Sequence, residues 1–308
     1  MTTIELTGLT KRFGATLAVD DLTVTVGAGA VTGFLGPNGS GKSTTMRMIL
    51  GLDAPTAGSA RIGGRPYAQL PDPMRVVGAL LDATWVHPNR SARSHLRWLA
   101  AAGGAGANRV DEMLDLVGLT PVAGKRAGTF SLGMRQRLGL AGALLGDPEV
   151  LVLDEPANGL DPAGIVWMRG LLQRLAAQGC TVLVSSHLLA EMALTATNLV
   201  VIGGGRLVAQ GSTADVLGGS ARVVRVQAAV PAALAEALRA AGLPVRELPG
   251  EHAVEIPGAT TTDVGEIAAR HGLALRELTM RQASLEEAFM ELTGASAQFV
   301  ATTAALAS

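Results

Sequence analysis

The sequence predicts an α/β fold followed by a smaller α+β domain. Short apolar segments recur through roughly the first 220 residues, with helical patterns between them. Several of these segments end in glycine, acidic or hydroxyl residues, as strands do when ligands bind at the carboxyl edge of a sheet. The composition then changes after Gly218, Gly219 and Ser220, where a second set of elements begins.

The first segment that predicts a binding site begins with a buried strand, expected over residues 30–35. This strand leads through a glycine-rich loop into a helix, expected over residues 42–50. The loop and the first helical turn comprise Gly36, Pro37, Asn38, Gly39, Ser40, Gly41, Lys42, Ser43 and Thr44. Glycines let the backbone N–H groups turn toward phosphate oxygens, Lys42 can reach the β- and γ-phosphates, and the Ser43 hydroxyl can bind Mg²⁺. A chance glycine-rich turn is the alternative, but strand, loop and helix together favour a nucleoside triphosphate site.

A second buried strand is expected over residues 149–153, and Asp154 and Glu155 follow it. Since adjacent residues of a strand point to opposite faces, the two carboxylates are expected to have different roles. Asp154 is suited to orient Mg²⁺ through water, and Glu155 to accept a proton from an attacking water. Taken alone, the pair is equally consistent with an ordinary strand end followed by acids.

Two further segments are expected to face the same phosphates. A strand over residues 181–184 precedes His187, which is suited to donate to the γ-phosphate and to hold Glu155 and the water in line. Ser131 is a natural N-cap for the helix that follows it, and the positive end of that helix, with Gly133 and Met134, favours an anion.

Composition excludes several classes of protein. The chain has 308 residues, 48% of them hydrophobic, but its apolar runs fall short of the roughly 20 residues of a spanning helix, and no secretory signal is visible. A single cysteine, Cys180, rules out an internal disulfide framework and fits a reducing cytoplasm. The net charge of −1 and 3% aromatic content argue against a nucleic-acid partner.

Over about residues 1–220, the motifs resemble those of the ATP-binding subunits of ABC transporters. The matching motifs are Gly36 to Thr44 (Walker A), 149–155 (Walker B, with Glu155 as the catalytic glutamate), Ser131 to Met134 (signature), 158–162 with Asp161 (D-loop), His187 (switch histidine) and Phe13 (the aromatic that stacks on adenine). The resemblance implies a P-loop NTPase fold with a mixed sheet and a helical subdomain at about residues 83–145. It also implies ATP and Mg²⁺ as ligands, with Lys42, Glu155 and His187 catalytic.

The same resemblance implies two partners. In the family, the signature of one subunit acts on the nucleotide held by another, so a dimer, most simply a homodimer, is expected. A separate multi-span permease would hold the chain at the cytoplasmic face of the membrane. The signature reads Phe-Ser-Leu-Gly-Met, and Asp82 stands where the family has a glutamine and is a third candidate metal ligand beside Ser43 and Asp154.

Both departures resemble those of a subgroup of the family, the ATPases that drive efflux of drugs, antibiotics or antimicrobial peptides through separate ABC-2-type permeases. A soluble switch of the same family without a membrane partner is the main alternative. A kinase-like P-loop enzyme is a weaker one, since it leaves Ser131 and His187 unexplained.

The remaining segments carry no catalytic pattern. Trp85 and His87 are candidates for contact with the permease, although buried packing is the favoured interpretation of Trp85. Residues 221–294 are expected to form a ferredoxin-like domain of order β-α-β-β-α-β, regulatory or dimer-supporting, with a last helix opening at Ser284. Residues 295–308 are expected to be a flexible tail.

Overall fold

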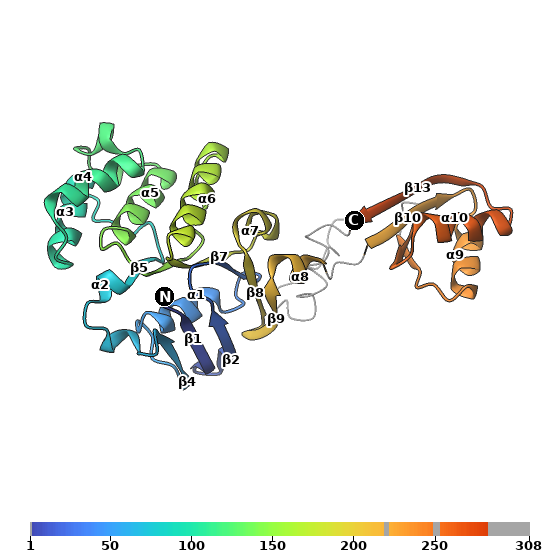
Figure 1. Cartoon of the computed structure of the whole chain (residues 1–308), viewed down its shortest axis with the longest axis horizontal. Helices are drawn as coiled ribbons and strands as arrows, with labels where there is room; N and C mark the ends of the chain where they lie inside the picture. Colours follow the sequence, from blue (N-terminus) through green and yellow to red (C-terminus); the bar gives the residue numbers. More distant parts are fainter. Residues whose placement is uncertain (1, 219–221, 249–252, 283–308) are drawn as a thin grey trace, which may run out of the picture. The chain divides into compact units, whose positions relative to one another are not determined.

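The computed structural model describes residues 2–218, 222–248 and 253–282. The chain divides into two compact units after residue 213, and each is described by itself (Figure 1). None of the helices in the described ranges combines the length and apolar character needed to cross a bilayer.

The core of the first unit is a six-stranded sheet. Its strands are β3 (Val31–Leu35), β5 (Val77–Leu80), β6 (Val150–Leu153), β7 (Thr181–Ser186), β8 (Asn198–Gly203) and β9 (Arg206–Ser212). Their order is β5-β6-β7-β3-β8-β9, parallel except for β9, which runs antiparallel to β8. Every residue of β3, β6 and β7 is buried, as expected for strands covered on both faces. The predicted mixed sheet is confirmed.

Helices connect these strands and form the predicted helical subdomain. α1 (Lys42–Ile49), α2 (Pro73–Val76), α6 (Pro162–Ala177) and α7 (Leu189–Thr195) belong to the sheet region, while α3 (Ala92–Ala102), α4 (Ala107–Leu116) and α5 (Leu132–Ala143) pack against one another. Short 3₁₀ turns lie at Tyr67–Gln69, Thr120–Val122 and Ala127–Thr129. Figure 1 shows α3, α4 and α5 grouped at one end of the unit.

A three-stranded antiparallel sheet was not expected from the sequence. It consists of β1 (Ile4–Phe13), β2 (Thr16–Val26) and β4 (Ala57–Ile62), in the order β2-β1-β4. Bulges interrupt its register, which breaks the strict alternation by which a strand is recognised. Its apolar side joins α1 and the larger sheet in one core.

The second unit contains another sheet. After α8 (Thr213–Gly218), where the division falls, come β10 (Arg222–Ala228), α9 (Pro231–Ala240), β11 (Arg246–Leu248), β12 (Ala253–Pro257), α10 (Thr261–Arg270) and β13 (Leu275–Gln282). The strands are antiparallel in the order β11-β12-β10-β13, and α9 and α10 pack on the sheet around Val224, Val226 and Ile256. The helix expected from Ser284 and the tail 295–308 lie outside the described residues.

Candidate functional site

The strand order brings the predicted site residues to one edge of the large sheet. β6, β7 and β3 are neighbours and parallel, so their carboxyl ends lie side by side. The glycine-rich loop follows β3, Asp154 and Glu155 follow β6, and His187 follows β7. Segments more than 100 residues apart in the chain therefore converge on one site.

The loop between β3 and α1 requires glycine at two positions. A Cβ on Gly36 would lie 2.4 Å from Ser40 Oγ and 2.5 Å from the Ile202 carbonyl oxygen. Gly41 has a φ of 101°, and its Cβ would lie 2.5 Å from the carbonyl oxygen of Ala18. The backbone thus winds more tightly than any side chain allows, as a loop that surrounds a phosphate with N–H groups must.

Lys42 lies beneath this loop and is 6% exposed. Its Nζ donates to the carbonyl oxygens of Gly36 (2.6 Å) and Pro37 (3.2 Å) and lies 3.8 Å from Glu155 Oε1. Burial lowers the pKa of Lys42, while the nearby Glu155 and Asp154 carboxylates oppose that shift. The ammonium group is therefore positioned at the loop by weak acceptors that a phosphate oxygen can replace.

Glu155 is the centre of the acidic side of the site. Its Oε2 lies 2.9 Å from His187 Nδ1, and its N–H donates to Ser185 Oγ at 2.8 Å. The expectation that Asp154 and Glu155 alternate as strand residues is wrong, because Glu155 lies beyond β6 with a left-handed φ of 46°. A turn, not strand alternation, separates the two carboxylates.

Ser185, to which the sequence analysis assigned no role, links the two acids. Its hydroxyl donates to Asp154 Oδ1 and accepts from the Glu155 N–H. A hydroxyl residue at the end of a buried strand was the available signal, but only the pairing of β6 with β7 shows what it contacts.

The predicted metal ligands are oxygen donors, which suit Mg²⁺. Ser43 is exposed on the first turn of α1, and Asp154 directly follows strand β6. Asp82 follows β5, next to β6, and its Oδ1 accepts from the Thr84 N–H at 2.7 Å. Within the described ranges, no group of three or more His, Cys, Asp or Glu side chains lies close enough together to hold a metal ion.

Two side chains near the site cap helices, and only the Ser131 cap was predicted. Ser131 Oγ accepts from the Met134 N–H at 3.2 Å at the start of α5, which confirms the predicted N-cap. Gly133 packs on the next loop so closely that a Cβ would lie 2.6 Å from the Gly159 carbonyl oxygen. Asp161 Oδ1 accepts from the Gly164 N–H at 2.8 Å and caps α6.

Two aromatic residues that the sequence singled out, Phe13 and Trp85, lie on the surface. Phe13, at the end of β1, is 49% exposed, and Lys11 Nζ lies 4.9 Å from its ring centroid. Trp85 is 62% exposed, so the packing favoured by the sequence analysis is wrong. It lies in the loop after β5, outside the sheet core, and the exposed ring is free to meet a partner.

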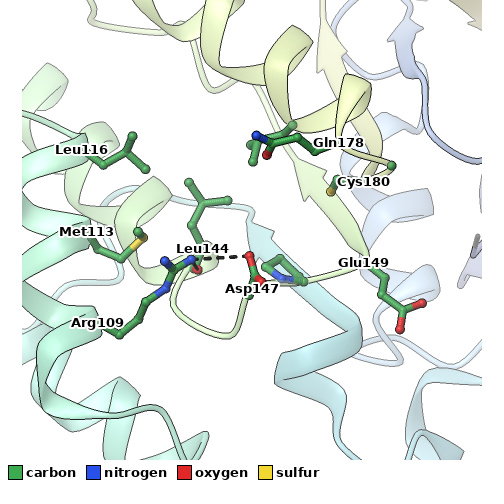
Figure 2. A pocket seen from close by; sticks show the side chains of 11 residues that line it. Arg109, Met113, Leu116, Leu144, Asp147, Glu149, Gln178 and Cys180 are labelled. Carbon is green, nitrogen blue, oxygen red and sulfur yellow. Dashed lines mark hydrogen bonds and ion pairs between the residues drawn. The ribbon is translucent and has the colours of Figure 1, made fainter.

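A pocket of about 310 Å³ lies at the other end of β6 and β7 and holds none of the predicted site residues (Figure 2). Arg109 Nη2 and Asp147 Oδ1 lie 3.5 Å apart there. Burial raises the pKa of the Cys180 thiol to about 11, so the side chain is a poor nucleophile. The predicted site residues thus lie at the carboxyl ends of the strands, whereas this pocket lies at the amino ends of β6 and β7.

Together, the glycine loop, the buried lysine, the carboxylates after β6 and the histidine after β7 define a P-loop ATPase. The family described as "ABC transporter" matches residues 19–158, and one described as "AAA domain, putative AbiEii toxin, Type IV TA system" matches residues 125–193. A domain of unknown function matches residues 221–286.

Known relatives give the same result. "Uncharacterized ABC transporter ATP-binding protein YhcH" of Bacillus subtilis is 37% identical, with 95% of this chain and 96% of the relative covered. "Bacitracin transport ATP-binding protein BcrA" of Bacillus licheniformis is 43% identical over 67% of this chain and 68% of the relative. A solved "ATP binding subunit of ABC transporter" is 27% identical with a TM-score of 0.62, covering 70% of this chain and 92% of that one. The chain belongs to the family of ABC transporter ATP-binding proteins and is an ATP-binding ATPase.

Proposed function

We propose that this chain is the motor subunit of an exporter. Two copies close on two MgATP molecules and, through a separate multi-span permease, drive an antibiotic, drug or peptide out of the cell. The relative named for bacitracin transport, 43% identical over two thirds of each chain, supports this class of cargo. The permease contact would hold the chain at the cytoplasmic face of the membrane.

Each side chain of the cluster has a distinct role in the proposed reaction. Lys42 leaves the carbonyl oxygens of its own loop and binds the β- and γ-phosphates. Glu155 accepts a proton from the attacking water, and His187, 2.9 Å from Glu155, orients that carboxylate and donates to the γ-phosphate. Ser43 and Asp154, with Asp82 nearby, would hold Mg²⁺, which neutralises charge on the phosphates when bound.

The second copy supplies what one chain lacks. The hydrogen bonds described for Ser131 are to Met134 and Arg135 of its own helix, and Leu132 beside it is 41% exposed. This exposed helix end, with Gly133 and Met134, is suited to bind the γ-phosphate of a nucleotide held by another copy. Phe13 would stack on adenine in its own copy, and Asp161 would lie in the interface between copies.

A surface near the site fits the permease. Trp85, on the loop after Asp82, and Trp98 on α3 are 62% and 54% exposed, and the Arg90 guanidinium lies 4.8 Å from the Trp98 ring. Exposed tryptophan rings, here with an arginine beside Trp98, are typical of contact residues in protein interfaces. Since this loop begins at Asp82, movement of the permease would reach the metal-binding edge directly.

The convergence of Lys42, Glu155 and His187 at one edge of the sheet is the observation on which the proposal rests. The test is to co-express the chain with a candidate ABC-2-type permease and measure ATP-dependent uptake of bacitracin into inverted vesicles. Uptake that is lost in Glu155→Gln and reduced in a Trp85→Ala, Trp98→Ala double variant supports the exporter. ATP hydrolysis by the free chain that never responds to any permease would favour the soluble switch instead.

A further inference from the structure

One polar side chain in the core of the first unit has no role in the chemistry described so far. Gln136, on the second turn of α5, is 7% exposed. Its Nε2 donates to the Glu155 carbonyl oxygen at 3.4 Å, while its Oε1 is buried and finds no protein partner within the described residues. The side chain thus reaches from the helix that Ser131 opens to the backbone of the proposed base.

Packing alone does not explain a glutamine at this position. A buried amide oxygen without a partner lowers stability, whereas methionine has nearly the same volume and carries no such penalty. A buried polar group that is only half satisfied requires an explanation, and violations of this kind are expected at functional sites. The contact with Glu155 is therefore the part of Gln136 that needs an explanation.

The backbone of Glu155 needs support. A non-glycine residue with φ of 46° is held in a region that costs free energy, and such residues persist where their surroundings fix them. Three groups fix this one: Ser185 Oγ accepts from its N–H at 2.8 Å, and its carbonyl oxygen accepts from Asn158 N at 3.2 Å and from Gln136 Nε2. Ser185 belongs to the sheet and Asn158 to the same turn, so Gln136 is the support that comes from α5.

The rest of α5 is fitted to the same turn. Gly133 approaches the Gly159 carbonyl oxygen closely, and a Cβ on Gly159 would lie 2.5 Å from the Leu132 side chain. On the next turn, Arg137 donates to the Val117 carbonyl oxygen at 3.1 Å and lies 4.6 Å from the Trp167 ring of α6. With the helix held on both sides, a shift of its first turn is transmitted to residues 155–159.

We propose that Gln136 is a positioning residue that couples the signature helix of each copy to that copy's own Glu155. Because Ser131 binds the nucleotide of the second copy, occupation of one site then sets the base of the other. The proposal rests on the proposed function, since it requires two sites in a dimer. It assigns to Gln136 the cooperativity between sites and not the binding of ATP.

The test compares Gln136→Met with Gln173→Met in the full chain. Gln173, on α6, also donates its Nε2 to a backbone carbonyl oxygen, that of Leu194 at 3.1 Å, so its variant removes the same kind of bond away from Glu155. We expect kcat of Gln136→Met to fall about tenfold or more, with KM for ATP within about twofold and the Hill coefficient near one. Gln173→Met should match the wild type.

A second pair of measurements separates positioning from folding. In the Glu155→Gln background, adding Gln136→Met should leave ATP-driven dimerisation unchanged, because no proton transfer is required. If Gln136→Met does not fold, Gln136→Leu, which is smaller and also removes the donor without burying a charge, should give the same loss of kcat. Wild-type kcat and cooperativity in the Gln136 variants, or a kcat loss matched by lost dimerisation, would overturn the proposal. Failure of the proposed function itself is recognised separately, by a wild type that neither dimerises with ATP nor hydrolyses it.

Discussion

Replacement of Glu155 by glutamine tests the proposed reaction most directly, because it removes one charge and keeps the shape. Glu155 Oε1 lies 3.8 Å from Lys42 Nζ, and Oε2 lies 2.9 Å from His187 Nδ1. If Glu155 is the general base, its loss should lower kcat by about 10²- to 10⁴-fold. The backbone contacts of residue 155 do not depend on the carboxylate, so the fold should be retained.

The same variant should bind ATP more tightly. At 3.8 Å the Lys42 and Glu155 charges attract by about 4 kcal/mol at an effective dielectric constant of about 20, and desolvation of Lys42 offsets most of this. We take the net Lys42–Glu155 attraction as about 1 kcal/mol. The wild type loses this attraction when Lys42 turns to the phosphates, whereas Glu155→Gln has none to lose, so the Kd of the variant for ATP should be about fivefold lower. Removing a carboxylate from beside the phosphates acts in the same direction.

The assays are phosphate release for kcat, calorimetry for Kd and light scattering with ATP for the dimer. Glu149→Gln is the matched control, since Glu149 is an exposed carboxylate immediately before the same strand, β6, and should leave all three unchanged. Turnover by Glu155→Gln at the wild-type rate would refute the assignment of the base. Weaker ATP binding would refute the inferred competition for Lys42.

Three further outcomes follow from single contacts. Gly36→Ala places a methyl group 2.4 Å from Ser40 Oγ and should abolish ATP binding, measured by calorimetry, while Gly39→Ala, whose Cβ meets nothing within 4 Å, should be milder despite its φ of 82°. Ser131→Ala removes the α5 cap, which should lower the free energy of unfolding in urea by about 1 kcal/mol. This variant should still bind ATP as a separate chain but lose hydrolysis, and full turnover would contradict a role of Ser131 in the second site. Burial raises the pKa of Cys180 to about 11, against 9.0 for a free thiol, so less thiolate is present at pH 8. Alkylation by iodoacetamide at pH 8 should therefore be about a hundredfold slower than for an unstructured peptide and should become faster toward pH 11. A fast reaction at pH 8 would contradict burial of the thiol.

The parts of the site that depend on local patterns were predictable from the sequence. The loop from Gly36 to Lys42 carries its conformation in its glycines, and the strands before Glu155 and His187 are short apolar runs. Parallel strands place their carboxyl ends together, so the meeting of these residues followed once the strands were recognised. Ser131 was equally accessible, because an N-cap depends only on its own helix.

The remaining features depend on contacts between distant segments. Ser185 and Gln136 acquire their roles from the pairing of β6 with β7 and the packing of α5 on the turn after β6, and neither leaves a periodic signal. The left-handed backbone of Glu155 could not be predicted, because nothing in the sequence separates an acidic residue that continues a strand from one in the turn that follows it. A lone tryptophan such as Trp85 has no period that separates a buried ring from an exposed one.

The turn after β6 explains why the working unit should contain two copies. Its first residue, Glu155, faces Lys42 of the same chain, while Gly159, further along, supports the start of α5 through its contact with Gly133. In the proposed dimer, the base would serve one nucleotide, and the helix end that Ser131 caps would bind the nucleotide of the other copy. Since residues 155–161 include the base and contact the start of α5, a change of geometry at one site of the proposed dimer would disturb the other, and we expect hydrolysis at the two sites to be coupled.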